Sequence, residues 1–493
     1  MKVKNYFVIL LLSMLLICCA GAISAASDDN VDINGLNQIA EDDSVSTIEN
    51  NEKPVSVSQD ETILKDTSQD TLSPYDQFVK DLNDNTGTVY LNGNIKISEP
   101  FKTIKHKTVI DGKGHTIDAQ HKTYIFKISA PVTLKNIILK NGKSDNGGAL
   151  YANAALTLNN CQFINNVATK AGGAIFVKGT LNIDNSKFIN NKATDSGGAI
   201  ANTYGKSTIK NSAFEKNSVS SSKSTGYGGA IWFHKSSSSV SKSTFKSNTC
   251  LSKVLKSHKK ATKYKFNGGA IAYSSGSTHS LNDCKFSGNK ASNHGGSLFV
   301  YKCKSLKINK CDFTKNRAVY EDGGAMSFTA NKLTVTNSNF KKNLAYEDGG
   351  AFDSYSLTGK KIRITVKNTK FDSNTAYKCG GAIWMGVKTV YNIANSKFIK
   401  NKASSAGALE AEDGSAKITK CTFTSNKAAK VTSWVVKTKS GGRLSHSGGA
   451  ILVKNHCKIF KCTFKKNKAT YGKVVKNEGG KVTAKGNIGY KLN

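Results

Sequence analysis

Hydrophobic and polar residues alternate in short runs along most of this chain. Runs such as Leu181-Asn182-Ile183 and Leu333-Thr334-Val335 place an apolar residue at every second position. This period of two is typical of β-strands, and these runs do not sustain the spacing of three to four that a helix needs. Clusters of Asn, Ser, Asp and Gly separate the runs and indicate turns. The pattern predicts about three short strands in each stretch of about 25 residues.

Two sequence elements recur at this spacing. The closing element is Phe-x-x-Asn, always with Cys, Ser or Thr two residues before the Phe. The opening element is a Gly-Gly pair before apolar residues, with one degenerate copy at Ala406-Gly407. The second glycine of the pair is Gly148, Gly173, Gly198, Gly229, Gly269, Gly296, Gly324, Gly350, Gly381 or Gly449. The Phe is Phe163, Phe188, Phe214, Phe245, Phe286, Phe313, Phe340, Phe371, Phe398, Phe423 or Phe464. So many paired copies at one period indicate a repeat architecture.

The repeats predict an all-β fold, a single-stranded right-handed parallel β-helix. A repeat without a crossover helix buries its strands only by pairing them in parallel with those of the neighbouring repeats. We expect each Phe to stack on the next Phe, the small residue to fill an interior corner and the Asn side chains to form a ladder. The glycine pair supplies freedom at a bend where a Cβ would clash. A β-sandwich of independent hairpins is the alternative, but it does not require identical anchors.

The paired elements carry a family resemblance. They are similar to the repeats of polymorphic outer-membrane proteins and of archaeal adhesin-like surface proteins with β-helix repeats. The resemblance covers about Gly147 to Ala469, and the stretch from Val109 to Asp118 resembles the first coil of such domains. It implies a role in surface display or adhesion, although a repeat scaffold does not by itself fix a function.

The N-terminal region divides into three segments before the array. Residues 1–26 have the lysines, the apolar run and the small residues of a signal peptide, with a retained membrane anchor as the alternative. Residues 27–74 hold twelve Asp/Glu and two Lys, and we expect an acidic disordered linker. Residues 75–87 place Phe78, Val79 and Leu82 at helical spacing, which predicts a capping helix with Ser73 at its start.

The β-helix is expected over residues 88–493. After cleavage of the signal no transmembrane helix is expected. The segment after Ala469 is polar and contains no sorting motif, so attachment to a cell is expected through charge, loops or an uncleaved signal. Five of the nine cysteines after the signal occupy the small position before Phe, which indicates buried free thiols rather than metal ligands.

Charge narrows the candidate partners. From Tyr75 onward the chain holds 67 Lys/Arg and 22 Asp/Glu, a net charge of +45, and only three of the basic residues are arginine. Such a surface attracts anionic polymers, such as acidic glycans or cell-wall polymers, through screened electrostatics. It also serves solubility alone. Nucleic acid is not expected as a natural target, because the protein is predicted to be secreted and contains little arginine.

Three insertions enlarge the same corner of the repeat, between Phe-x-x-Asn and the next Gly-Gly. Two of them, Thr249–Asn267 and Lys427–Ser447, are rich in lysine and contain no acidic residue. Insertions on one face of a repeat array commonly form its binding surface, and neutral drift is the alternative. The candidate binding residues are Lys253, Lys256, Lys259, Lys260, Trp434, Lys437, Lys439 and Arg443.

One acidic cluster carries a chemical prediction. Successive repeats contain Glu321-Asp322 and Glu347-Asp348 before the glycine pair, so the four carboxylates are expected to stack at steps of about 5 Å. They repel one another unless a cation or a proton intervenes. An ordinary charge ladder with Lys378 is the expected arrangement, and it needs no cofactor. Calcium, which suits such oxygen ligands, and a glycosidase carboxylate pair are the alternatives.

The sequence therefore predicts a secreted or surface-associated adhesin-like protein that binds an anionic polysaccharide or cell-wall polymer. Partners on a host or neighbouring cell are included in this expectation. A β-helix polysaccharide lyase or glycoside hydrolase and a purely structural wall component remain the alternatives. No catalytic residues are assigned, because the chain lacks the Asp-rich triplets expected of β-helix galacturonases.

Overall fold

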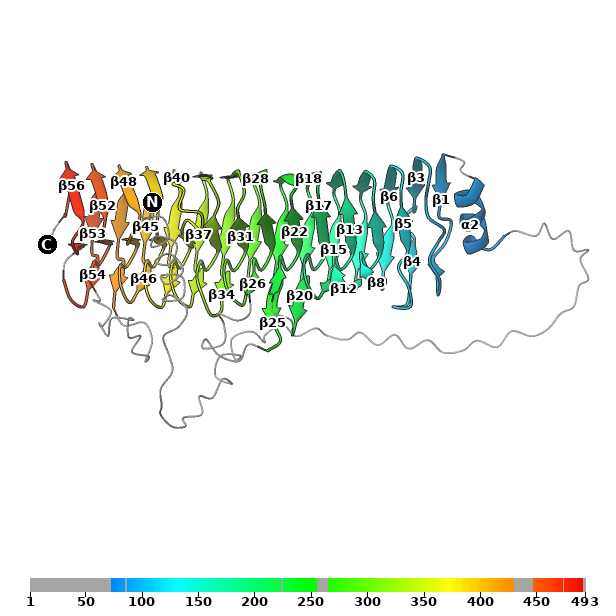
Figure 1. Cartoon of the computed structure of the whole chain (residues 1–493), viewed down its shortest axis with the longest axis horizontal. Coiled ribbons are helices and arrows are strands. Elements are labelled where there is room, and N and C mark those ends of the chain that lie inside the picture. The colour runs from blue at the N-terminus through cyan, green and yellow to red at the C-terminus, as the bar shows by residue number, and fades with distance from the viewer. Residues whose placement is uncertain are drawn as a thin grey trace, which may run out of the picture. The chain divides into compact units, whose positions relative to one another are not determined.

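Short strands stack in parallel, each on the equivalent strand one repeat later (Figure 1). The computed structural model describes residues 72–84, 87–222, 225–254, 265–429, 447–472 and 474–490, all within one compact unit from Leu72 to Asn493. The predicted signal peptide and nearly all of the acidic linker lie outside the described residues. No described helix is long and apolar enough to cross a membrane.

A representative coil contains four strands. They are β14 (Leu181–Asp184), β15 (Lys187–Ile189), β16 (Lys192–Ala193) and β17 (Ile200–Thr203). Each pairs in parallel with its counterparts in the adjacent coils. The sequence predicted about three strands per repeat. The additional strand is β16, whose two residues are too few to show a period of two.

The four strand positions build four sheets. Sheet A has 15 strands, from β1 (Thr88–Tyr90) to β56 (Lys481–Lys485), and sheet B has 14, from β2 (Ile95–Lys96) to β53 (Thr463–Lys465). Sheet D has 12, from β8 (Lys143–Asn146) to β54 (Lys468–Ala469). Sheet C has 13, from β5 (Phe126–Ile128) to β55 (Val475–Asn477). The predicted all-β parallel β-helix is confirmed.

The repeated Phe residues form one continuous stack inside the coil. Consecutive rings from Phe163 to Phe464 have centroids 4.7–5.1 Å apart and planes within 10° of parallel. All of them are buried. The register explains the stack, because each Phe is the pairing partner of the next Phe in sheet B. The stacking predicted from the sequence is confirmed.

The Asn residues of Phe-x-x-Asn form the expected ladder at the corner between sheets B and D. Asn191 donates from Nδ2 to the carbonyl of Phe163 at 2.9 Å and to Oδ1 of Asn217 at 3.0 Å. Its own backbone N–H also donates to Oδ1 of Asn217, at 3.0 Å. The amides thus satisfy backbone groups that the corner leaves without strand partners. The nine described cysteines are buried and unbridged, and burial raises the pKa of Cys161 and Cys303 to about 12.

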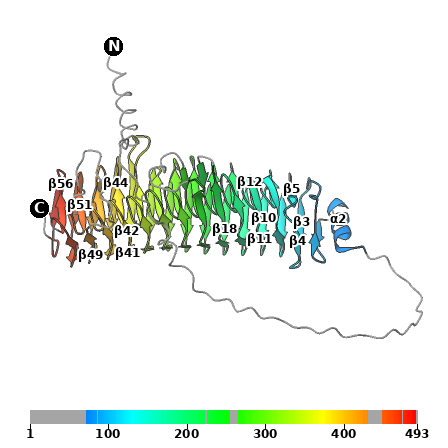
Figure 2. The ribbon, with the colours of Figure 1, turned by 90° about the horizontal axis from the view of Figure 1, so that it is seen from below.

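A short helix, α2 (Pro74–Asp84), covers the N-terminal end of the stack (Figure 2). Ser73 caps it as predicted, since its Oγ accepts the N–H of Asp76 at 3.1 Å. Phe78 is fully buried, and its ring centroid lies 5.1 Å from that of Phe101. The helix therefore contributes core contacts at an end where a β-array otherwise exposes apolar surface.

Two adjacent insertions pair with each other beside sheet D. The strand β21 (Thr225–Tyr227) lies in the first insertion, and β26 (Lys265–Asn267) closes the second. They pair in parallel, with Thr225 opposite Lys265. The described parts of these insertions therefore continue the coil-to-coil stacking at the predicted corner.

One buried histidine predicts an acid-sensitive stability. His279 is 1% exposed in an inward column where the next two coils place Leu306 and Leu333. Its Nδ1 lies 2.9 Å from Oγ of Ser238, and Nε2 has no partner among the described residues. Burial lowers the pKa of His279 to about 3. Below the unfolded value of 6.5, the unfolded chain therefore takes up a proton that the folded chain does not.

We expect His279→Leu to flatten the loss of stability that wild type shows from pH 6.5 downward. The free energy of unfolding of His279→Leu, relative to that of wild type, should be about 2–3 kcal/mol higher at pH 4.5 than at pH 7.5. This figure follows from two pH units below 6.5, at about 1.4 kcal/mol each. Urea unfolding at both pH values measures this difference. The exposed His106→Leu is the control and should leave the slope unchanged. Parallel pH profiles for wild type and His279→Leu would contradict the prediction.

Candidate functional site

Lysines of successive coils come side by side on the outward face of sheet A. In its strands inward and outward residues alternate, so Lys417 of β48 (Ser415–Thr419) points outward between buried Ala416 and Ile418. Lys458 of β52 (His456–Phe460) is its pairing partner in the next coil. Neighbouring strands lie about 4.8 Å apart, so the two ammonium groups share one stretch of surface.

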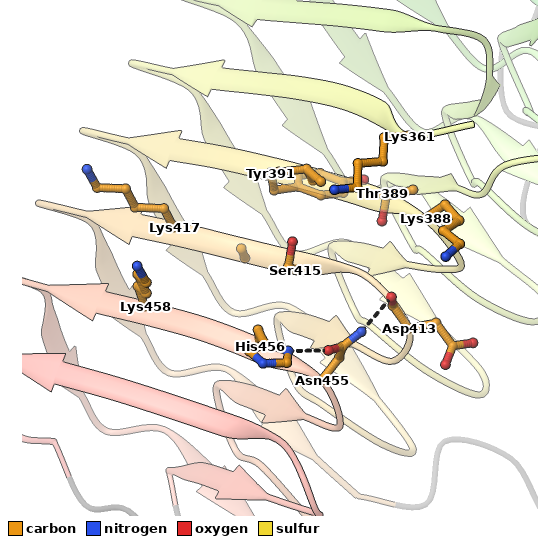
Figure 3. A pocket seen from close by; sticks show the side chains of 12 residues that line it. Lys361, Lys388, Thr389, Tyr391, Asp413, Ser415, Lys417, Asn455, His456 and Lys458 are labelled. Carbon is orange, nitrogen blue, oxygen red and sulfur yellow. Dashed lines mark hydrogen bonds between the residues drawn. The ribbon is translucent and has the colours of Figure 1, made fainter. Parts of the chain in front are cut away.

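These lysines border a depression of about 560 Å³ (Figure 3). It lies over the N-terminal parts of three neighbouring strands, β44 (Thr389–Ala394), β48 and β52. Its basic residues are Lys361, Lys388, Lys417, Lys458 and His456. All four lysines are exposed, and none makes an ion pair with another described residue.

The floor of the depression supplies hydrogen-bonding groups. Asn455 donates from Nδ2 to the carbonyl of Asp413 at 2.8 Å, and its Oδ1 contacts Nδ1 of His456. Ser415 lies near the middle of the labelled side chains, on the strand next to that of His456 (Figure 3). Cationic side chains around neutral polar groups form a surface that attracts sulfate, phosphate or carboxylate groups. Asp413 is the one carboxylate among the lining residues.

A second cluster lies where the chain enters sheet C. His294, Asp322, Asp348 and Cys379 each precede the glycine pair, and they stand in successive coils. Oδ1 of Asp322 accepts the N–H of Asp348 at 3.0 Å, and Oδ1 of Asp348 accepts the N–H of Cys379 at 2.9 Å. The predicted stacking of Asp322 on Asp348 is therefore present. Glu321 also stacks on Glu347, whose N–H donates to the Glu321 carbonyl at 3.2 Å.

Two cations hold the glutamates of this cluster. His294 Nε2 lies 2.6 Å from Glu321, and Lys378 Nζ lies 2.6 Å from Glu347. Burial alone would lower the pKa of His294, but Glu321 and Asp322 raise it to about 10. The expected pairing of Lys378 with the carboxylates is thus present. His294, to which the sequence analysis gave no role, makes the equivalent ion pair at the other end of the column, from the coil before Glu321.

Burial dominates the pKa of the aspartates. It raises the pKa of Asp322 to about 6, with a further contribution from Glu347. Burial, reinforced by Asp322, also raises the pKa of Asp348 and of Asp353 well above the usual range. The buried aspartates therefore favour the neutral, protonated form more strongly than exposed aspartates do.

The repeats themselves match a known family model. The model of the Chlamydia polymorphic membrane protein repeat matches residues 160–178, 185–203 and 368–385. Each matched segment runs from Phe-x-x-Asn through the Gly-Gly element and covers strands of sheets B, D and C. This chain is a polymorphic-membrane-protein-like β-helix repeat protein. Repeats of this type and the β-helix together indicate a family of surface proteins. No curated protein and no solved structure matches the chain.

The predicted loop site of this polymorphic-membrane-protein-like protein falls mostly outside the described residues. Lys253 is described, is exposed and follows β25 (Thr249–Ser252). The other seven candidates lie outside the described residues, namely Lys256, Lys259, Lys260, Trp434, Lys437, Lys439 and Arg443. Their role stays a prediction. The depression on sheet A was not predicted, although the outward, period-two positions of Lys417 and Lys458 carried the signal.

Proposed function

We propose that this protein acts at the cell surface or in the medium as an adhesin-like protein that binds anionic polymers. The proposed ligands are acidic glycans and cell-wall polymers, on the same cell, a neighbouring cell or a host cell. The lysine-lined depression on sheet A is the observation that carries the proposal. Its four lysines have no carboxylate partner among the described residues, so their charge remains available to a ligand.

The shape of the array favours an extended ligand over a small one. Lys417 and Lys458 pair across two adjacent coils at the strand spacing of about 4.8 Å, so one extended polymer chain can contact both side chains. Each contact is weak and screened by salt, so binding depends on many contacts at once. The loop lysines predicted from the sequence add to this surface in the proposal.

Degradation of the polymer and a purely structural wall role are the competing functions. A hydrolase requires one carboxylic acid and one carboxylate that reach a substrate. Here Glu321 and Glu347 are paired with His294 and Lys378. These ion pairs weaken the case for the two glutamates as a catalytic acid and base. Release of reducing ends from an acidic polysaccharide would favour the enzyme, and cell association without any preference among glycans would favour the structural role.

Replacing the depression lysines should weaken binding of polygalacturonate at low salt. We expect Lys361, Lys388, Lys417 and Lys458, all changed to Gln, to lower affinity about 30-fold, since exposed contacts contribute about 0.5 kcal/mol each. Biolayer interferometry at 50 and 300 mM NaCl measures this effect. Neutral dextran should not bind.

A matched variant separates the site from the total charge. Lys107, Lys143, Lys187 and Lys246 are exposed lysines outside the depression, and changing them to Gln removes the same charge. This control should lose less than about threefold in affinity if the depression is the site. Equal losses in both variants would contradict the proposal. A third variant, with Lys253, Lys256, Lys259, Lys260, Lys437 and Lys439 changed to Gln, tests the predicted loops separately.

A further inference from the structure

Carboxyl groups from neighbouring coils converge where the chain enters sheet C. One oxygen each of Asp322, Glu347 and Asp348 lie within 4.8 Å of one another. Asp322 and Asp348 each use Oδ1 to accept a backbone N–H from the next coil. Their second oxygens are not needed for this ladder. The arrangement places oxygen atoms of three acidic side chains around one point of the surface.

A fourth carboxylate supplies independent evidence for a ligand here. Asp353 lies in β39 (Phe352–Ser354) at an outward position of sheet C, yet it is fully buried. Its Oδ2 accepts a hydrogen bond from Ser327 at 3.2 Å, whereas its Oδ1 has no partner among the described residues. A Cβ built on Gly323 would lie 2.4 Å from this Oδ1, so the oxygen faces the residue that follows Asp322. A buried carboxylate oxygen without a donor is costly.

Packing does not explain the choice of an acid at this position. The pairing partners of Asp353 in the adjacent coils are Ser327 and Trp384, which are both uncharged. The five carboxyl groups of the cluster, including Glu321, face two cations, His294 and Lys378. In the fully ionised state three negative charges remain, and one divalent cation offsets two of them.

The donor set favours calcium over magnesium. All the candidate ligands are carboxylate oxygens, which hard cations prefer. Calcium accepts oxygen ligands at 2.3–2.6 Å in flexible geometry, so opposite ligands stand up to about 5 Å apart. Magnesium requires about 2.1 Å and a regular octahedron. The spread of 4.8 Å among Asp322, Glu347 and Asp348 fits the larger ion.

We propose that Asp322, Glu347 and Asp348 form a calcium site that joins two coils of the β-helix, with the buried carboxylate of Asp353 beside it. The cation links Asp322 of one coil to Glu347 and Asp348 of the next, and it offsets the unpaired negative charge of Asp353. It thereby fixes the corner through which the chain enters sheet C. This site is distinct from the lysine-lined depression on sheet A and does not depend on polymer binding.

Calorimetric titration of the full chain with CaCl₂ at pH 7.5, after removal of metal with EDTA, tests the site. We expect one calcium per chain, at least tenfold weaker binding of MgCl₂, and a rise in melting temperature of at least about 2 °C at saturating calcium. Asp353→Asn should lower calcium affinity at least tenfold, because it removes a buried negative charge beside the ion and keeps an oxygen for the contact with Ser327. Asp348→Asn should do the same.

The repeats provide folding controls for these variants. Asn267 occupies the equivalent position two coils before Asp322, and its Oδ1 accepts the N–H of His294 at 3.0 Å. Asp348→Asn therefore preserves the backbone ladder. Asp372→Asn removes a carboxylate that pairs with Lys370 on sheet B and should leave calcium binding unchanged. Absence of calcium binding up to 10 mM would overturn the proposal. Unchanged binding in both Asp353→Asn and Asp348→Asn would also overturn it, because the ion would then bind elsewhere.

Discussion

Adding one methyl group at Gly198 should destabilise the β-helix by more than about 4 kcal/mol. Gly198 is the second glycine of its pair, and a Cβ there would lie 2.0 Å from the carbonyl oxygen of Gly229 and 2.6 Å from the amide nitrogen of Ser218. Both atoms belong to the backbone of the next coil, so no side-chain rotation relieves the contact. Urea unfolding of Gly198→Ala measures the loss, which should first open the coils around the substitution.

Gly359→Ala is the matched control. Gly359 has a φ of +70°, but a Cβ at this position meets no atom within 4 Å. Its replacement should cost about 1–2 kcal/mol from the left-handed backbone alone. If Gly198→Ala costs no more than Gly359→Ala, then the coils do not approach one another as closely at the glycine column as the structure requires.

The same geometry explains the one degenerate glycine pair. In Ala406-Gly407 the first glycine is replaced, and Ala406 keeps a φ of +56°. The second glycine remains, and a Cβ on Gly407 would lie 2.2 Å from the carbonyl oxygen of Gly449. A Cβ on the first glycine of other pairs meets the carbonyl oxygen three residues later in the same coil, at 2.1 Å for Gly197, and Ala406 shows that this contact can be relieved. The contact of the second glycine is with the backbone of the next coil, and this glycine is kept in the degenerate pair. The sequence predicted a bend at the pair but did not distinguish these two requirements.

Periodic features were predictable because each is repeated in every coil. The stack of Phe rings, the ladder of Asn amides and the columns of carboxylates all follow from placing equivalent residues one above another. The helix cap at Ser73 followed from local chemistry alone. The fourth strand was missed because strands such as β16 contain only two residues.

The fourth carboxylate of the candidate calcium site was missed for a different reason. Asp353 alternates with inward Phe352, so a period of two predicts exposure. Instead small outward residues of sheet C are buried beside larger outward neighbours, as Ala201 is between Phe176 and Trp232. Small residues at these outward positions were the available signal. The depression on sheet A was not predicted because lysine occupies outward positions throughout the array, so the lysines of the depression do not stand out in the sequence.

The second large effect is expected at the buried Asn ladder. Asn316 donates from Nδ2 to the carbonyl of Phe286 at 3.0 Å, and its Oδ1 accepts the N–H of Asn289 at 3.0 Å. It also bonds to the amide side chains of Asn289 and Asn343. Asn316→Leu fills the space but leaves one buried N–H and one buried carbonyl without a partner. We expect a loss of about 4 kcal/mol, since each orphaned group costs about 1–3 kcal/mol.

The comparison with Asn339→Leu isolates the buried hydrogen bonds from the loss of an amide as such. Asn339 is exposed in the next coil, in β37 (Asn339–Lys341), where its Nδ2 donates to Asp312 at 2.7 Å. Water replaces that partner when the amide is removed, so the loss should stay below about 0.5 kcal/mol. Guanidinium unfolding of both variants gives the difference directly. If the two losses of stability are equal, the Asn ladder does not stabilise the β-helix beyond what the stacking of the coils already provides. A large difference means that the Asn amides stabilise the corner between sheets B and D, because they supply hydrogen bonds to backbone groups that have no partner in a neighbouring strand.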